Sequence, residues 1–159
     1  MPLDQSSFRS VLGRFASGVT VVTVRDADGR DYGLTVSAFC SLSLDPPLVL
    51  VCVDRTASGH GALAAASHFA INVLAEQQEA HSRRFSNKDE KARFEGVGFT
   101  RGAGGQPLLD DALAHLACRM AAQHDGGDHT IFVGEVEEAN AAEARPLLYY
   151  RGGYARLER

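Results

Sequence analysis

Segments rich in β-branched and apolar residues recur through most of this chain, whereas helical patterns are few and short. The β-rich runs cover residues 19–24, 33–43, 48–54, 69–74, 115–123 and 131–139, with a shorter run at 154–157. A regular alternation of strands and helices would favour a parallel sheet, and this order lacks one. Antiparallel strands that close into a barrel leave no exposed sheet edge. The pattern therefore predicts a mainly β, antiparallel barrel with a few short flanking helices.

Local signals define the first elements of this barrel. Phe8, Val11, Leu12 and Phe15 follow the i, i+3, i+4, i+7 spacing of an amphipathic helix over residues 4–16. Asp28-Gly29 lies between the first two β-rich runs and is typical of a tight hairpin, so these strands should pair antiparallel. Further short helices are expected at residues 58–67 and 76–84.

Length and charge limit the class of protein. The 159 residues are typical of one domain, which we expect to span residues 1–159, and the net charge of −4 offers no attraction to nucleic acid or anionic membranes. Residues 1–8 lack the basic and apolar regions of a signal peptide, and no apolar run approaches the roughly 18 to 20 residues of a membrane span. A cytoplasmic location is therefore expected. Three widely spaced cysteines and the histidine spacings predict neither a disulfide framework nor a metal site.

Hydroxyl side chains alternate with apolar ones along residues 33–43, just before a double proline. The hydroxyls are those of Thr35, Ser37, Ser41 and Ser43, which a strand would direct broadly to one side. Such a face can simply be solvated. Alternatively, small hydroxyls and backbone N–H groups can line a cleft for a polar or anionic heteroaromatic ligand, because bulky side chains would block its approach.

Several motifs in this chain resemble one known family. The run G-L-T-V-S-A-F-C-S-L-S-L-D-P-P-L-V-L-V from Gly33 resembles the signature of the flavin reductase-like family, the short-chain NAD(P)H:flavin reductases of two-component monooxygenases. Further similar segments are F-R-S-V-L-G-R-F-A-S-G-V-T-V-V-T from Phe8, F-A-I-N-V-L from Phe69, G-D-H-T-I-F-V-G-E-V from Gly127 and P-L-L-Y-Y-R-G-G-Y from Pro146. The resemblance therefore covers nearly the whole chain.

The resemblance implies an antiparallel six-stranded FMN-binding split barrel that forms a homodimer, with the flavin near the subunit boundary. The implied activity is hydride transfer from NADH or NADPH to FMN or FAD, with the reduced flavin supplied to a partner monooxygenase. A flavin-binding electron carrier or sensor without nicotinamide turnover is the alternative. Because the cofactors carry hydride chemistry themselves, no protein nucleophile is needed.

The resemblance also implies the residues of the site. The flavin contacts would be Thr35, Val36, Ser37, Ala38, Ser43, Leu44, Asp54, Ser58, Phe85, Ser86 and Tyr154, and His129 would position the nicotinamide. Four of these positions have a purely structural alternative. Ser58 would be the N-cap of a helix and help present backbone donors to phosphate, but it could also cap the helix without a ligand. Phe85 could be core, Tyr154 could be packing at the barrel end and His129 could be a structural residue.

Overall fold

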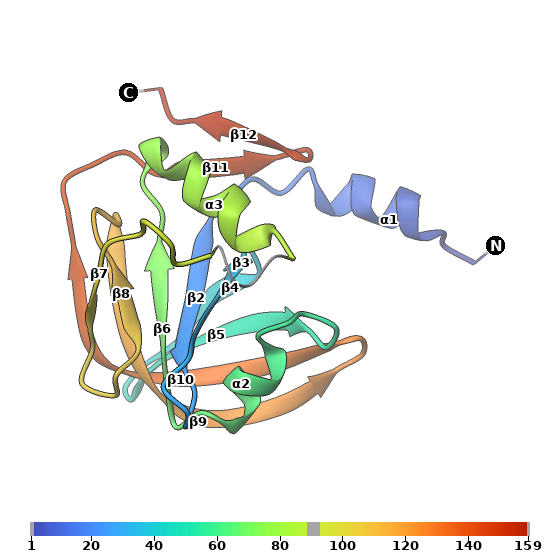
Figure 1. Ribbon diagram of the computed structural model, residues 1–159. Helices are drawn as coiled ribbons and strands as arrows, with labels where there is room; N and C mark the ends of the chain where they lie inside the picture. Colours follow the sequence, from blue (N-terminus) through green and yellow to red (C-terminus); the bar gives the residue numbers. More distant parts are fainter. Residues whose placement is uncertain (1, 89–92, 159) are drawn as a thin grey trace.

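A seven-stranded antiparallel sheet dominates the computed structural model, which describes residues 2–88 and 93–158 (Figure 1). Its strands, in spatial order, are β3 (Asp31–Val36), β2 (Thr20–Arg25), β6 (His68–Val73), β9 (Ala114–Gly126), β10 (His129–Ala141), β5 (Pro47–Asp54) and β4 (Phe39–Leu44). The outermost strands, β3 and β4, are consecutive in the chain and are joined only by Ser37 and Ala38. A flat sheet of this size would be roughly 29 Å wide, whereas so short a link spans at most roughly 11 Å. The sheet must therefore curl until its two edges meet.

The barrel is split where these edges meet. Within residues 2–88 and 93–158, no ladder pairs β3 with β4 or β5. The predicted fold class is confirmed, but the main sheet contains seven strands instead of six.

The additional strand arises because the run predicted as one strand over residues 33–43 forms two. The Phe39 N–H donates to the Ser37 carbonyl over 2.9 Å, and the Cys52 N–H donates to the Ala38 carbonyl over 3.0 Å. The chain thus turns at residues 37–38 and passes from one edge of the barrel to the other.

Smaller elements surround the barrel. A three-stranded sheet has the order β1 (Ser17–Gly18), β11 (Leu147–Tyr150), β12 (Gly153–Arg156), and β7 (Phe99–Arg101) pairs with β8 (Pro107–Leu109). The helices are α1 (Gln5–Leu12), α2 (His60–Ala65), the 3-10 helix η1 (Glu76–Gln78) and α3 (Glu79–Ser86). In Figure 1, α3 lies between the barrel and the β11–β12 hairpin.

The predicted β2–β3 hairpin is confirmed. Its register runs from Thr20 opposite Val36 to Arg25 opposite Asp31. Asp26 Oδ1 accepts hydrogen bonds from the N–H groups of Asp28 and Arg30 at 2.9 and 2.8 Å, and Gly29 has φ +83°. Because Gly adopts positive φ without steric cost, it suits this position of the turn.

Strand β2 is buried on both faces and separates two hydrophobic clusters. Val22 and Val24 pack inside the barrel with Val51, Phe69 and Phe132. Val19 and Val21 face the other cluster, which contains Leu74, Phe85, Leu109 and Leu147. Each fully buried side chain of this size contributes about 1.5 to 3 kcal/mol. The second cluster therefore holds α3 and its Phe85 firmly against the outside of the barrel.

The predicted N-terminal helix is present, but it ends at Leu12 and not near Ala16, so that Phe15 lies beyond it, and none of its residues is buried. Asp4 caps it, with Oδ1 accepting from the Ser7 N–H at 2.9 Å. The apolar residues that define its face remain exposed, and Phe8 and Leu12 retain 48% and 56% of their accessible surface. Packing within this chain therefore leaves the apolar face of α1 without a partner.

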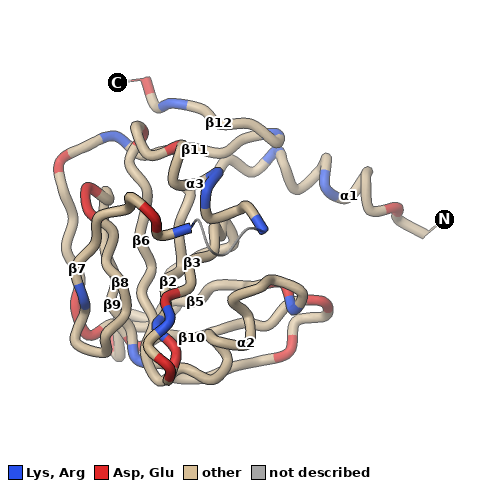
Figure 2. Tube along the Cα trace, in the orientation of Figure 1, with Lys and Arg blue, Asp and Glu red and all other residues tan. Residues whose placement is uncertain are grey.

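The positions of basic and acidic residues are interspersed along the chain trace (Figure 2). All cysteines are free, and no cluster of three or more potential metal ligands occurs in the described part of the chain. Among the residues that the structure places, no helix has the length and apolar character required to cross a membrane.

Candidate functional site

A cavity of about 600 Å³ lies at the split of the barrel. Its walls come from β3 and the link that follows, from the end of β5 and the turn after it, from the end of α3 and the segment beyond, and from the start of β10. The lining residues are Leu34, Thr35, Val36, Ser37, Ala38, Cys52, Val53, Asp54, Thr56, Ala57, Ser58, Phe85, Ser86, Lys88, Arg93 and His129. Curling of the sheet thus brings together segments that are far apart in the sequence.

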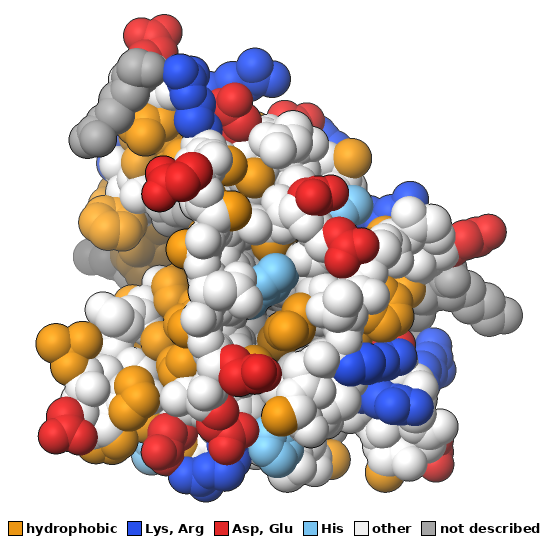
Figure 3. Space-filling view, turned by 90° about the vertical axis from the view of Figure 1, so that its left-hand side faces the viewer, with side chains coloured by type: hydrophobic (Ala, Val, Ile, Leu, Met, Phe, Trp, Pro, Cys, Tyr) orange, Lys and Arg blue, Asp and Glu red, His pale blue; other side chains and the backbone are white. Residues whose placement is uncertain are grey.

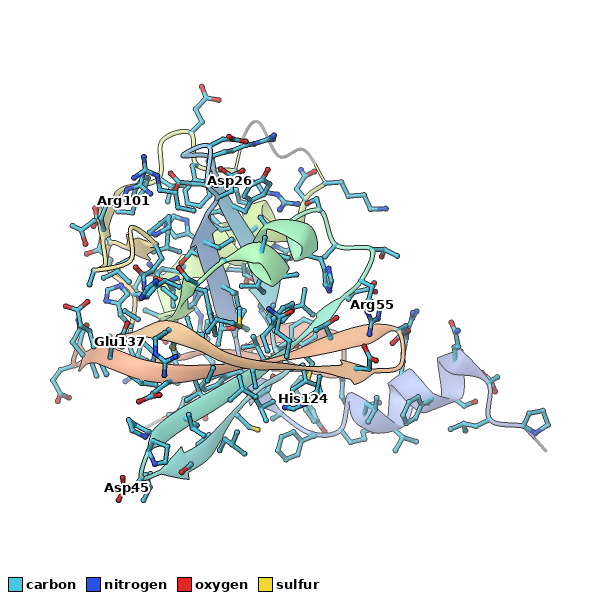
Figure 4. The ribbon with its side chains drawn as sticks, turned by 90° about the horizontal axis from the view of Figure 1, so that it is seen from below. Asp26, Asp45, Arg55, Arg101, His124 and Glu137 are labelled. Atoms are coloured by element: carbon cyan, nitrogen blue, oxygen red, sulfur yellow. The ribbon has the colours of Figure 1, made fainter. Side chains whose placement is uncertain are left out.

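Most of the predicted site residues meet in this cavity. They are Thr35, Val36, Ser37, Ala38, Asp54, Ser58, Phe85, Ser86 and His129. Ser43 and Leu44 do not line it, because they lie beyond a register shift at the far end of the β4–β5 hairpin, opposite Leu48 and Pro47. This end of the hairpin, marked by Asp45 in Figure 4, projects away from the barrel. Tyr154 lines a smaller cavity beside the first.

On the β3 side, one carbonyl of α3 orients two hydroxyls. The Thr35 and Ser86 hydroxyls both donate to the Ser82 carbonyl, at 2.7 and 2.8 Å. Each hydroxyl has a single proton and uses it in the bond to this carbonyl. Only the lone pairs of its oxygen therefore remain for a ligand in the cavity. Thr35 and Ser86 are therefore arranged to accept hydrogen bonds from a ligand.

On the β5 side, Asp54 organises the turn between β5 and α2. Its Oδ1 accepts from the Thr56 N–H and from the Thr56 hydroxyl, both at 2.8 Å. Both hydrogen bonds stabilise the carboxylate and so hold the pKa of Asp54 below its ordinary value. The bond from the Thr56 N–H has the larger effect and the bond from the Thr56 hydroxyl the smaller. Asp54 therefore places a fixed negative charge at the cavity rim.

The prediction that Ser58 is the N-cap of a helix is wrong. The turn held by Asp54 delays the helix by one residue, so that Gly59 is the N-cap of α2 and makes no side-chain capping bond. Ser58 nevertheless lines the cavity.

His129 stands at the first position of β10, directly across the ladder from Asp54. Its Nδ1 lies 2.7 Å from Oδ1 of Asp128. An ionised carboxylate can only accept, so this contact places a proton on Nδ1 and fixes the orientation of the ring. The other ring nitrogen, Nε2, remains for a ligand in the cavity.

Phe85 belongs to the core and also lines the cavity. It is 2% exposed, makes a T-shaped contact with Phe94 at 5.1 Å and also lines the cavity. A Cβ added at Gly33 would lie 2.4 Å from the Phe85 ring. Gly33 is therefore required for the ring to pack closely against β3.

Lys88 and Arg93 are site residues that the motifs did not indicate. Arg93 is 6% exposed, and its guanidinium donates to the Gly33 carbonyl over 2.8 Å and twice to the Asn87 carbonyl. The positive charge of Arg93 is thus fixed in the cavity wall, and the exposed Lys88 adds a second positive charge. A cavity with oriented acceptors, an aromatic wall and two cations fits a flavin nucleotide, whose ring carries an N–H donor and whose chain ends in phosphate.

Fold and cavity together define a split-barrel protein with a site suited to a flavin nucleotide. The family model described as "Flavin reductase like domain" matches residues 12–158. This chain belongs to the flavin reductase-like family, as the motifs predicted.

Individual relatives agree with this assignment. The reductase subunit HsaB of a flavin-dependent monooxygenase from Rhodococcus jostii is 41% identical over 157 residues, covering 98% of this chain and 80% of that protein. The FMN reductase (NADH) SmoA from Agrobacterium fabrum is 43% identical over 156 residues, covering 98% and 88%. The solved structure of the NADH:FAD oxidoreductase SgcE6 of Streptomyces globisporus, in complex with NAD and FAD fragments, superposes with a TM-score of 0.92 at 39% identity, covering 98% of this chain and 93% of that chain.

Proposed function

We propose that this chain is a cytoplasmic NAD(P)H:flavin oxidoreductase that binds FMN or FAD at the split of the barrel and reduces it. The observation that carries the proposal is the meeting of Thr35, Ser37, Asp54, Ser86 and His129 in one cavity. Relatives named as reductase components of monooxygenases support a role in supplying reduced flavin to an oxygenase.

Each wall of the cavity has a distinct part in this function. Bound flavin supplies the ring that accepts the hydride. The short side chains of Ser37 and Ala38 allow the ring to approach the backbone closely, while the Thr35 and Ser86 hydroxyls accept from its N–H or hydroxyl groups. Lys88 and Arg93 attract the phosphate end. His129 offers Nε2 to the nicotinamide at the opposite side of the cavity.

NADH is the proposed hydride donor. A 2′-phosphate is usually recognised by an arginine or lysine, and Arg83, Arg93 and Arg101 are candidates for that role. In the structure, Arg83 pairs with Glu79 and lies over the Tyr154 ring, and Arg101 pairs with Asp31. Arg93 is held by backbone carbonyls. Arg83 and Arg101 are thus engaged in ion pairs, Lys88 and Arg93 are assigned to the flavin phosphate, and relatives named as NADH-dependent reductases support the same choice.

A homodimer is part of the proposal. Helices shorter than about 12 to 15 residues are marginal in water unless their apolar face is covered, and α1 has 8 residues with none buried. The β4–β5 hairpin also exposes Leu42 and Leu44, at 50% and 96%. In Figure 4 the hairpin projects from the barrel at the lower left and α1 at the lower right. On the face shown in Figure 3, hydrophobic side chains gather at the lower left. A second copy would cover both surfaces by two-fold symmetry.

The activity is tested by following NADH and NADPH oxidation at their absorbance band with FMN, FAD or riboflavin added to the purified protein. We expect rapid flavin-dependent oxidation, with NADH preferred. Bound flavin without turnover would overturn the proposal and favour the electron-carrier alternative.

Replacing His129 with Ala is expected to raise the KM for NADH about tenfold, the effect of losing one hydrogen bond to the nicotinamide. The flavin Kd should change less than about twofold, since the flavin walls remain intact. Steady-state kinetics and flavin titration measure the two quantities. His124→Ala, an exposed histidine on β9 outside the cavity, is the matched control. Unchanged NADH kinetics in His129→Ala would show that His129 does not position the nicotinamide and has only a structural role.

A further inference from the structure

The turn between β9 and β10, residues 125–128, leads directly into His129 but lies outside the hydrophobic core. No residue of the stretch 123–128 is buried. Gly127 has φ +70° and follows Gly126, and two successive glycines give a turn more conformational freedom than other residues would. Beyond the strand pairing itself, apolar packing therefore does little to fix the position of this turn.

Arg55, the first residue after β5, makes three hydrogen bonds to this turn. Its backbone N–H donates to the Asp128 carbonyl over 3.0 Å, and its Nε donates to the Gly127 carbonyl over 3.3 Å. Its Nη2 donates to the Asp125 carboxylate over 2.5 Å. Figure 4 shows Arg55 beside the end of the β9–β10 hairpin. A single guanidinium thus holds the turn at two points, and the backbone of the same residue holds it at a third.

The turn in turn determines where His129 lies. Asp128 accepts from His129 Nδ1 at 2.7 Å and so leaves Nε2 for a ligand in the cavity. The Asp128 side chain is 88% exposed, so its position depends on the backbone of the turn. If the turn moved, the Asp128 carboxylate and the imidazole would move with it, and a displacement of about 1 Å is enough to weaken a positioned contact strongly.

Fold stability alone does not account for this arrangement. The side chains of Arg55 and Asp125 are 42% and 94% exposed, and ion pairs this exposed contribute little to the free energy of unfolding. Arg55 also does not line the cavity, so a direct contact with flavin is not part of the geometry. What its hydrogen bonds do fix is the one turn that carries a residue of the site.

We propose that Arg55 is a positioning residue for the nicotinamide, because it fixes the turn at residues 125–128 and thereby holds His129 at the cavity. This inference rests on the proposed function, in which His129 Nε2 meets the nicotinamide. A guanidinium suits the role, since its N–H donors diverge in one plane and reach a carbonyl and a carboxylate together. The single ammonium group of lysine cannot reproduce both contacts in that geometry.

Arg55→Ala is expected to raise the KM for NADH about fivefold, which is less than the effect of removing the imidazole itself. The flavin Kd and the melting temperature should stay close to those of the parent protein. Arg55→Lys should show most of the same rise, because it keeps the charge but not the two directed contacts. Arg119→Ala is the matched control. It removes an exposed ion pair with Glu135 on the same hairpin, outside both cavities, and should leave the KM unchanged.

A double-mutant cycle tests whether Arg55 acts through His129. In a His129→Ala background, Arg55→Ala should cause no further rise in the KM for NADH, because the group that it positions is gone. A rise that persists in this background, or a normal KM in Arg55→Lys, would overturn the proposal and indicate that Arg55 attracts NADH by its charge. A KM that rises in His129→Ala but not in Arg55→Ala would overturn this inference alone. Unchanged NADH kinetics in both single variants would overturn the role of His129 in the proposed function as well.

Discussion

Flavin binding is expected to be lost in Ser37→Trp, with the Kd raised at least roughly 100-fold, or about 2.7 kcal/mol. Ser37 is exposed, belongs to the link between β3 and β4, and lines both cavities. An indole at this position would occupy the space that the flavin ring needs. Because the side chain lies outside both hydrophobic clusters, the melting temperature should stay close to that of the parent protein. Flavin fluorescence titration and thermal unfolding measure the two effects.

A tryptophan elsewhere on the surface controls for the added bulk. Thr100→Trp places the same side chain at an exposed position of β7, away from both cavities, and should bind flavin normally. Normal flavin titration of Ser37→Trp would show that the flavin does not bind at the split.

The sequence predicted the strands well, but it could not locate the split. Apolar and hydroxyl residues continue to alternate through Ser37 and Ala38, so periodicity shows no break between β3 and β4. The break follows from closure of the sheet, which brings Cys52 of β5 to the Ala38 carbonyl. Such a contact between distant strands has no local signature.

The site was predictable where its residues lie within continuous motifs. Thr35, Ser37 and His129 belong to sequence motifs that contain strands of the barrel. The resemblance of each motif to the family therefore also predicted where its residue lies. Arg93 was only one of several arginines in the sequence. Its place in the wall depends on the Gly33 carbonyl, 60 positions earlier in the chain.

Two residues of the same motif lie outside the cavity of their own chain. Ser43 and Leu44 continue the run that contains Ser37, but the register shift after Ser41 and the turn before Pro47 place them at the far end of the hairpin. The exposure of Leu44 there, at 96%, is accounted for by the proposed subunit interface.

A charged α1 face is expected to dissociate the proposed homodimer. Phe8 and Leu12 are one helical turn apart on the exposed apolar face, so Phe8→Glu with Leu12→Glu would place carboxylates in the subunit interface. Removing a carboxylate from water without a partner costs several kcal/mol, and the two-fold symmetry doubles the number of carboxylates. The mass in solution should fall from twice 17.0 kDa to 17.0 kDa. Light scattering during gel filtration measures it.

The same substitution should leave the barrel folded, because no residue of α1 is buried within its own chain. Flavin affinity should fall at least about tenfold if the partner subunit borders the cavity, as the family resemblance implies. Ser6→Glu with Ser10→Glu adds the same two charges with the same spacing on the opposite face of α1, and this variant should remain dimeric. A parent protein of 17.0 kDa in solution, or a dimer that persists in the Phe8 and Leu12 variant, would refute the assignment of this face to a second copy.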